Sequence, residues 1–204
     1  MRVRKILVIL SAIIAISHIQ VHATGDGIRA LAHLSTARKE IAASAAYAHF
    51  SRYAAARDIP NRRLTDEELD AWKTAYHFFG GVNENEWDLI HYTNLVREQY
   101  GLPPFEYDPT LMMAARFKAQ SMSQLQYFAH ESPVYGTWYI IPRELFGSTS
   151  SFLAENLARR QRSPQEAVDA LMNSPGHRDN ILRDNVTRMG AGFYNYHWVQ
   201  FFSN

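Results

Sequence analysis

The chain has 204 residues, of which 47% are apolar, and its formal charge is +1. A chain of this length and apolar content can bury a core of its own, which argues against a disordered polymer. It contains no cysteine, which excludes disulfides, thiolate metal sites and cysteine nucleophiles.

The first 23 residues have the pattern of a secretory signal peptide. A basic MRVRK segment precedes an apolar run of 12 residues, and VHA stands before Thr24. A retained membrane anchor fits less well, because a spanning helix needs about 20 apolar residues. We therefore expect cleavage after Ala23 and a protein that is secreted or held in the cell envelope or periplasm. Cleavage changes the formal charge from +1 to −2, so we expect no nucleic-acid partner.

Residues 24–82 predict a helical extension ahead of the main domain. The alanine-rich segment 27–57 spaces its few large apolar residues loosely along a helix face. Residues 24–63 carry seven basic and three acidic side chains, which suits either a solvated helix or an arm that docks on an anionic surface. The TDEE stretch at 65–68 has the form of a capping box and predicts a helix to about Phe79.

Residues 83–204 predict a domain in which helices precede strands. One helix is expected over 86–100, and Asp108-Pro109 predicts the start of a second that continues to about Tyr127. The SPQE stretch at 163–166 predicts a third helix through Met172. Residues 186–203 are β-branched and aromatic, and a short turn around Tyr194 to Tyr196 predicts a hairpin.

Two of the nine histidines stand out because they lie in loops that contain serine and proline. These are His130 and His177, whereas His77, His91 and His197 lie inside expected elements and favour structural roles. Glu155 adds a carboxylate to these two imidazoles, and the three residues are dispersed along the sequence. Such a set predicts a divalent-metal site, with zinc favoured by the histidines.

Other catalytic motifs fail to match. His130-Glu131 lacks the second histidine that a zincin helix places four residues later, because position 134 is valine. The chain has no Gly-x-Ser-x-Gly elbow, no P-loop and no glycine-rich dinucleotide fingerprint. Serine hydrolases and nucleotide-binding enzymes therefore have no motif support.

Residues 86–204 contain, in this order, the motifs FAHES, AENLA, SPQEAVDALMNSPGHRDNIL and MGAGFYNYHWVQFF. This order of motifs resembles the CAP superfamily, also called SCP-like. The superfamily includes cysteine-rich secretory proteins, insect antigen 5 and plant pathogenesis-related proteins. The cysteine-free composition is similar to that of its bacterial branch.

This resemblance implies an α+β fold, a three-layer α-β-α sandwich with a central antiparallel sheet and an open cleft. In the family two histidines and two glutamates line the cleft, and in several members they bind zinc or another divalent cation. By resemblance, three of these residues are His130, Glu155 and His177. The second glutamate is missing, because Asn173 or Ser174 occupies its position.

Three functions follow as hypotheses. The favoured one is an exported binding module with a lipid, glycan or protein ligand in the cleft and a divalent cation at His130, Glu155 and His177. The first alternative is a metal-dependent hydrolase of the peptidase type, with Glu155 as general base. In the second alternative the basic segment 24–63 associates with the cell envelope or a membrane surface.

Overall fold

The structure is a computed structural model that describes residues 58–78, 81–151 and 153–204. The signal peptide expected at 1–23 and the alanine-rich segment at 27–57 lie outside the described residues.

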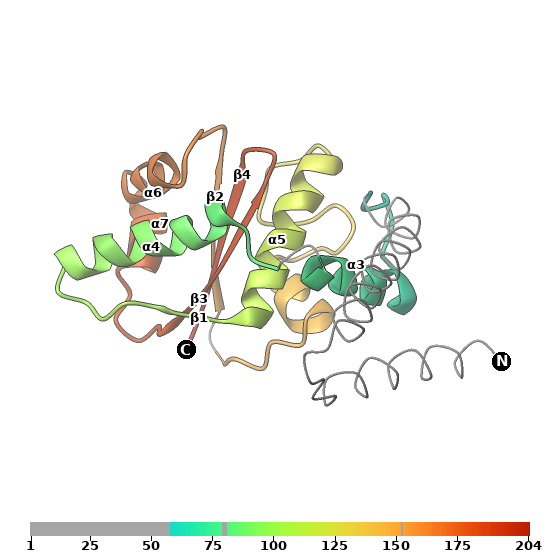
Figure 1. The fold of residues 1–204 in the computed structure, drawn as a ribbon, viewed down its shortest axis with the longest axis horizontal. Helices are drawn as coiled ribbons and strands as arrows, with labels where there is room; N and C mark the ends of the chain where they lie inside the picture. The colour runs from blue at the N-terminus through green and yellow to red at the C-terminus, as the bar shows by residue number, and fades with distance from the viewer. Residues whose placement is uncertain (1–57, 79–80, 152) are drawn as a thin grey trace, which may run out of the picture. The chain divides into compact units, whose positions relative to one another are not determined.

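A mixed sheet separates two groups of helices, which makes three layers (Figure 1). One face carries α4 (Glu84–Gln99), α6 (Pro164–Met172) and α7 (Pro175–Ile181). The other face carries α5 (Pro109–Gln124), with α3 (Asp66–Phe78) and the π-helical turn η1 (Ile141–Leu145) beside it. The α+β sandwich expected from the sequence is confirmed.

The described part of the chain forms one four-stranded sheet in the order β1-β3-β4-β2. Its strands are β1 (Glu106–Tyr107), β2 (Leu153–Arg159), β3 (Arg188–Tyr194) and β4 (His197–Ser203). The hairpin expected at the C-terminal end is confirmed, since β3 and β4 pair antiparallel with Tyr194 opposite His197. β2 also pairs antiparallel with β4, whereas the short β1 runs parallel to β3. β2 is therefore an edge strand.

The helix starts follow local capping chemistry. Thr65 and Glu68 exchange side-chain and backbone hydrogen bonds at the start of α3. Asp108 accepts from two backbone N–H groups of the first turn of α5, and Ser163 accepts from the backbone N–H of Glu166 in α6. Each bond satisfies a donor that a helix start leaves unpaired, which is why these starts were predictable from the sequence.

Three boundaries differ from the sequence-based expectation. The helix expected over 86–100 begins at Glu84, because Asn83 forms a capping box with Glu86. The next helix ends at Gln124 rather than near Tyr127, since Gln126 has a φ of 56° and leaves the helical region. The stretch around His177, expected as a loop, forms helix α7, which begins at Pro175, where proline suits the first helical position.

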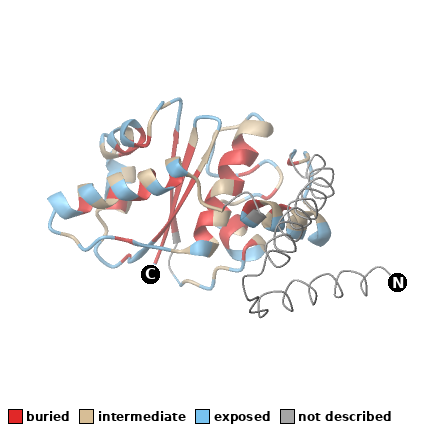
Figure 2. Cartoon of the chain, viewed as in Figure 1, coloured by how far each residue is buried: buried red, intermediate tan, exposed pale blue. Residues whose placement is uncertain are grey.

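Buried side chains gather on both faces of the sheet (Figure 2). On the α5 side, Trp72 and Tyr76 of α3 pack in the same core as Phe117 and Phe201. Residues 59–78 thus share a core with the sandwich. On the α4 side the core is built around Trp198 and is closed by residues of α6.

Helix α5 lies directly against β3 because two strand residues have no side chain. A Cβ on Gly190 would clash with the backbone of Leu111, and one on Gly192 would clash with the backbone of Ala115. These glycines allow the helix and strand backbones to approach closely.

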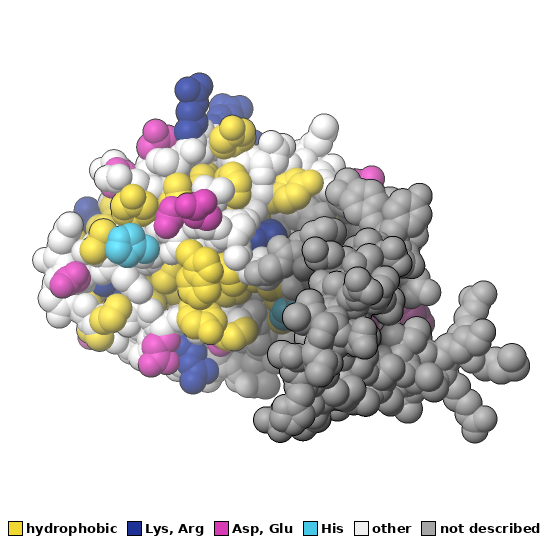
Figure 3. Space-filling model, viewed as in Figure 1, with side chains coloured by type: hydrophobic (Ala, Val, Ile, Leu, Met, Phe, Trp, Pro, Cys, Tyr) yellow, Lys and Arg dark blue, Asp and Glu magenta, His cyan; other side chains and the backbone are white. Residues whose placement is uncertain are grey.

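The surface of the described domain is mixed. Figure 3 shows hydrophobic side chains gathered near α4 and the chain leading through β1. The exposed side chains of Trp87 in α4 and Tyr107 in β1 meet edge to face at 5.1 Å. Within residues 58–78, 81–151 and 153–204, no helix is long and apolar enough to span a bilayer.

Candidate functional site

Strand β2 carries Glu155 into the interior. Glu155 lies opposite Phe201 of β4, and its side chain is only 1% exposed. The carboxylate uses one oxygen, Oε2, in a hydrogen bond with His130, while the other, Oε1, is buried without a hydrogen-bond partner in the structure. A buried carboxylate oxygen that accepts no hydrogen bond is costly, which makes Glu155 a candidate functional residue.

His130 follows α5 in a loop, and its ring is half exposed. Its Nδ1 lies 2.6 Å from Oε2 of Glu155, and 52% of the side chain is accessible. A carboxylate accepts hydrogen bonds, so the proton of this bond belongs on Nδ1 while Glu155 is ionised. The hydrogen bond orients the ring and leaves Nε2 as the nitrogen available to a ligand.

Lys118 of α5 is the buried cation of the site. Its Nζ donates to the backbone carbonyls of Ala129 and His130, at 2.9 and 2.7 Å, and lies 4.0 Å from Oε1 of Glu155. Lys118 therefore fixes the loop that carries His130 and balances the charge of the carboxylate. The sequence analysis missed it, although the buried stripe of Leu111, Ala115, Lys118 and Met122 has helical spacing and contains one charge.

His177 reaches the same edge of the sheet from the opposite face, on α7. Its backbone carbonyl accepts from Nδ2 of Asn156 at 3.0 Å. Asn156 is fully buried, donates also to Gln200 at 3.0 Å, and accepts from Asn180 of α7 at 2.9 Å. This network anchors α7 to β2.

The pKa values of the two histidines, His130 and His177, shift in opposite directions. The hydrogen bond that His130 donates to Glu155 raises the pKa of His130, against an opposing effect of burial. Burial, together with the charge of His130, lowers the pKa of His177. There is consequently a pH range around the ordinary imidazole value in which His130 is a cationic donor and His177 a neutral ring.

The pKa values of the buried Glu155 carboxylate and the buried Lys118 ammonium group also shift. Burial raises the pKa of Glu155, and the contacts with His130 and Lys118 oppose that rise. Burial lowers the pKa of Lys118, and Glu155 opposes that fall. Desolvation acts against both charges, so each depends on the other to remain ionised.

The sequence predicted His130, Glu155 and His177 as metal ligands. The structure brings His130 and Glu155 into contact and places His177 near enough for the charge of His130 to affect its pKa. In the part of the chain that the structure describes, no group of three or more acidic or histidine side chains is arranged to hold a metal ion. In the described geometry Glu155 lies behind His130 as an orienting carboxylate, which leaves the two imidazoles as the candidate ligands. The three-ligand set stays a prediction.

Residues 90–202 match the family model described as the cysteine-rich secretory protein family, CAP. An uncharacterised Bacillus subtilis protein, YkwD, is 41% identical over 112 residues, which is 55% of this chain and 43% of that protein. A second Bacillus subtilis relative, described as an uncharacterised membrane protein, YlbC, is 28% identical over 58% of this chain and 34% of its own length. The chain thus spans less than half of these relatives.

Solved structures share the fold. An extracellular protein with an SCP domain from Bacillus anthracis superposes with a TM-score of 0.58 at 25% identity, over 70% of this chain and 44% of that chain. An outer surface protein of Borrelia burgdorferi superposes with a TM-score of 0.50 at 20% identity, over 57% of this chain and 89% of that one. The second likeness concerns the fold alone.

Proposed function

Because the chain belongs to the cysteine-rich secretory protein (CAP) family, we propose that it is an exported binding module whose ligand meets the imidazoles of His130 and His177. The observation that carries this proposal is the 2.6 Å hydrogen bond between a half-exposed ring of His130 and the buried carboxylate of Glu155. The extracellular SCP protein of Bacillus anthracis supports export.

The pair of rings suits recognition of a polar group. His130, when protonated, donates from Nε2, while His177 with its lowered pKa accepts or binds as a neutral ring. A lipid, glycan or protein ligand that carries a hydroxyl, carbonyl or carboxylate oxygen fits this arrangement. Lys118 and Asn156 donate hydrogen bonds to the backbone carbonyls of the two histidines and so hold the segments that carry the rings. Lys118 also balances the charge of Glu155.

A divalent cation is part of the same proposal. Neutral imidazole nitrogens are ligands for zinc, and an imidazole whose other nitrogen donates to a carboxylate is a better one. His130 and His177 would hold the ion and water would complete its coordination. Two protein ligands are fewer than the three of a usual catalytic zinc site, so the affinity is expected to be modest.

Zinc is the first probe because it reports on both rings at once. Calorimetric titration of the protein should show one site that is lost in His130→Ala and in His177→Ala, with His91→Ala as a matched control on α4. Glu155→Gln should weaken binding roughly tenfold, since a change behind a ligating histidine typically costs 10- to 100-fold. Zinc binding that survives both alanine variants would contradict the assignment.

Hydrolysis with Glu155 as general base has weaker support. A general base must reach the proton it removes directly or through one water. The Glu155 side chain is 1% exposed, and His130 occupies one of its oxygens. The geometry therefore favours binding. Casein or peptidoglycan hydrolysis by the wild type that Glu155→Gln abolishes would favour the enzyme instead.

A further inference from the structure

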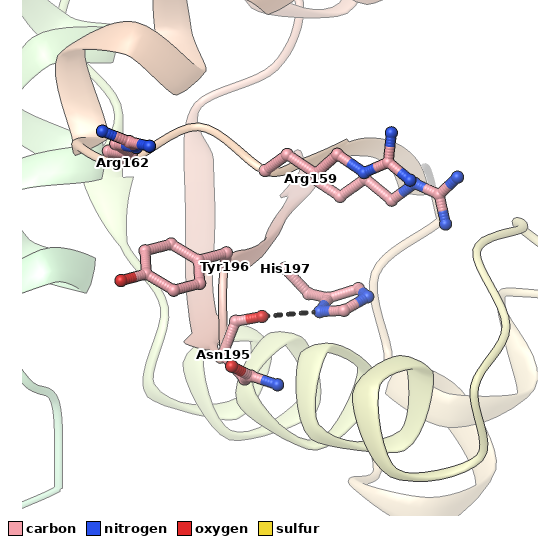
Figure 4. Close-up of a pocket in the computed structure, with 6 residues that line it drawn as sticks. Arg159, Arg162, Asn195, Tyr196 and His197 are labelled. Atoms are coloured by element: carbon pink, nitrogen blue, oxygen red, sulfur yellow. Dashed lines mark hydrogen bonds between the residues drawn. The ribbon is translucent and has the colours of Figure 1, made fainter.

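Apart from the histidine site, a pocket lies at the end of the sheet where the β3–β4 turn meets the segment after β2. Its volume is about 620 Å³, and it is lined by Arg159, Arg160, Arg162, Asn195, Tyr196 and His197. Figure 4 shows Arg159 beside His197 and Arg162 on the side of Tyr196. The lining contains three guanidinium groups and no carboxylate.

The pocket has a defined backbone frame. Asn195 and Tyr196 form a two-residue turn with φ values of 45° and 58°, and Arg160 has a φ of 78°. The backbone N–H of Arg160 donates to the carbonyl of Tyr196 at 2.9 Å, which joins the two segments. Non-glycine residues rarely adopt positive φ, and such residues concentrate at functional sites.

The hydrogen-bond donors of the three guanidinium groups are not used within the described part of the chain. Among the described residues, no side-chain hydrogen bond or ion pair of Arg159, Arg160 or Arg162 is present, and Arg159 rests on the ring of Phe128 at 4.8 Å. By contrast, Arg97 donates to three backbone carbonyls in the interior. A guanidinium offers five N–H donors, so the pocket presents many unused donors together with three positive charges.

The remaining lining residues add a ring nitrogen and an aromatic face. His197 Nδ1 lies 2.9 Å from the carbonyl of Asn195, and since a carbonyl only accepts, Nδ1 carries the proton and Nε2 is left for a ligand. The side chain of Tyr196 is 51% exposed, which provides a flat surface for a sugar ring or a carbon chain.

We propose that this pocket binds the phosphate group of a small organic phosphate, with the carbon part of the ligand against Tyr196. Guanidinium groups bind phosphate oxygens through paired N–H donors, and a phosphate carries enough negative charge to balance more than one arginine. The headgroup of an anionic lipid and a soluble sugar or glycerol phosphate share this chemistry. The residues that line this pocket do not include His130 or His177, the two histidines of the candidate functional site.

Glycerol 3-phosphate is the probe, titrated by calorimetry or by amide NMR shifts. Arg159→Gln and Arg162→Gln are each expected to weaken binding roughly tenfold, as the loss of a charge-assisted contact implies. Arg188→Gln is the matched control, because Arg188 lies on β3 at the end opposite Tyr194 and the variant removes the same charge. Equal loss in the control, or no loss in the two pocket variants, would overturn the proposal, and unchanged melting temperatures establish that the variants fold.

Vesicle sedimentation then separates the two sources of phosphate. Binding to phosphatidylglycerol but not phosphatidylcholine vesicles, lost in Arg159→Gln and displaced by glycerol 3-phosphate, identifies a lipid headgroup. Binding of glycerol 3-phosphate without vesicle binding identifies a soluble phosphate. Vesicle binding that neither the variant nor glycerol 3-phosphate affects, with no binding of glycerol 3-phosphate, contradicts a phosphate pocket. His130→Ala should leave phosphate binding unchanged, so failure here is distinguishable from failure of the histidine site.

Discussion

Replacing Asn156 by alanine tests whether the buried amide network holds the His177 helix in place. The side chain of Asn156 is fully buried and makes three hydrogen bonds, to the carbonyl of His177, to Gln200 and from Asn180. A net contribution of about 1 kcal/mol for each bond gives a loss of about 3 kcal/mol in the free energy of unfolding. The substitution also leaves the buried side-chain oxygen of Gln200 without its donor, which lowers the stability further, so about 3 kcal/mol is a lower estimate.

Urea unfolding measures the loss, and Asn180→Ala provides its internal check. Asn180 makes only one of the three bonds, so that variant alone should lose about 1 kcal/mol. In the Asn156→Ala background the bond is already gone, and the second substitution should cost almost nothing. A loss below about 1 kcal/mol for Asn156→Ala, or full additivity in the double variant, would refute the network.

Two further changes test the site and the packing. Glu155→Gln should lower the pKa of His130, which histidine NMR measures, because the carboxylate that raises it is gone. A pKa raised in the folded state stabilises the fold below the ordinary value of 6.5 and loses this effect as the pH rises through the folded value. The wild type should therefore exceed the variant in unfolding free energy by more below pH 6.5 than above it, and a constant difference would contradict this account. Gly192→Ala should cost about 1–3 kcal/mol or more, since its Cβ would clash with the backbone of Ala115. Gly176→Ala, with open space around it, should be neutral or stabilising in the same urea experiment, and equal costs would argue against the close approach.

Local chemistry explains which parts of the fold were predictable from the sequence. The starts of α3, α5 and α6 depend on side chains within three residues of the helix, namely Thr65 with Glu68, Asp108 and Ser163. The hairpin was predictable because its two strands are adjacent and joined by a short turn. By contrast, β2 pairs with β4 across a long stretch of chain, so its sequence alone did not show that it forms an edge strand.

The residues of the candidate site also fall into those that the sequence indicated and those that only the structure revealed. His130 and Glu155 were predicted as cleft residues and metal ligands from the resemblance to the family; in the structure they lie 2.6 Å apart, and their binding of a metal stays a prediction. Lys118 was missed because its role depends on which side of α5 faces the loop after it, and that side is chosen by packing. His197 was expected to be structural, and its Nδ1 does bond the carbonyl of Asn195, but it also lines the pocket of the three arginines because β2 ends beside the β3–β4 turn.

The sequence by itself determined the starts of α3, α5 and α6, the terminal hairpin and the family, because capping, alternation and motif order act over short distances. Only the tertiary structure decided that Glu155 turns one oxygen toward His130 and buries the other beside Lys118. It also decided that Arg159, Arg160 and Arg162 share a pocket with residues of a distant turn. The physical reason is that charges and hydrogen bonds depend on distance in space, and strand pairing sets those distances between residues far apart in the chain.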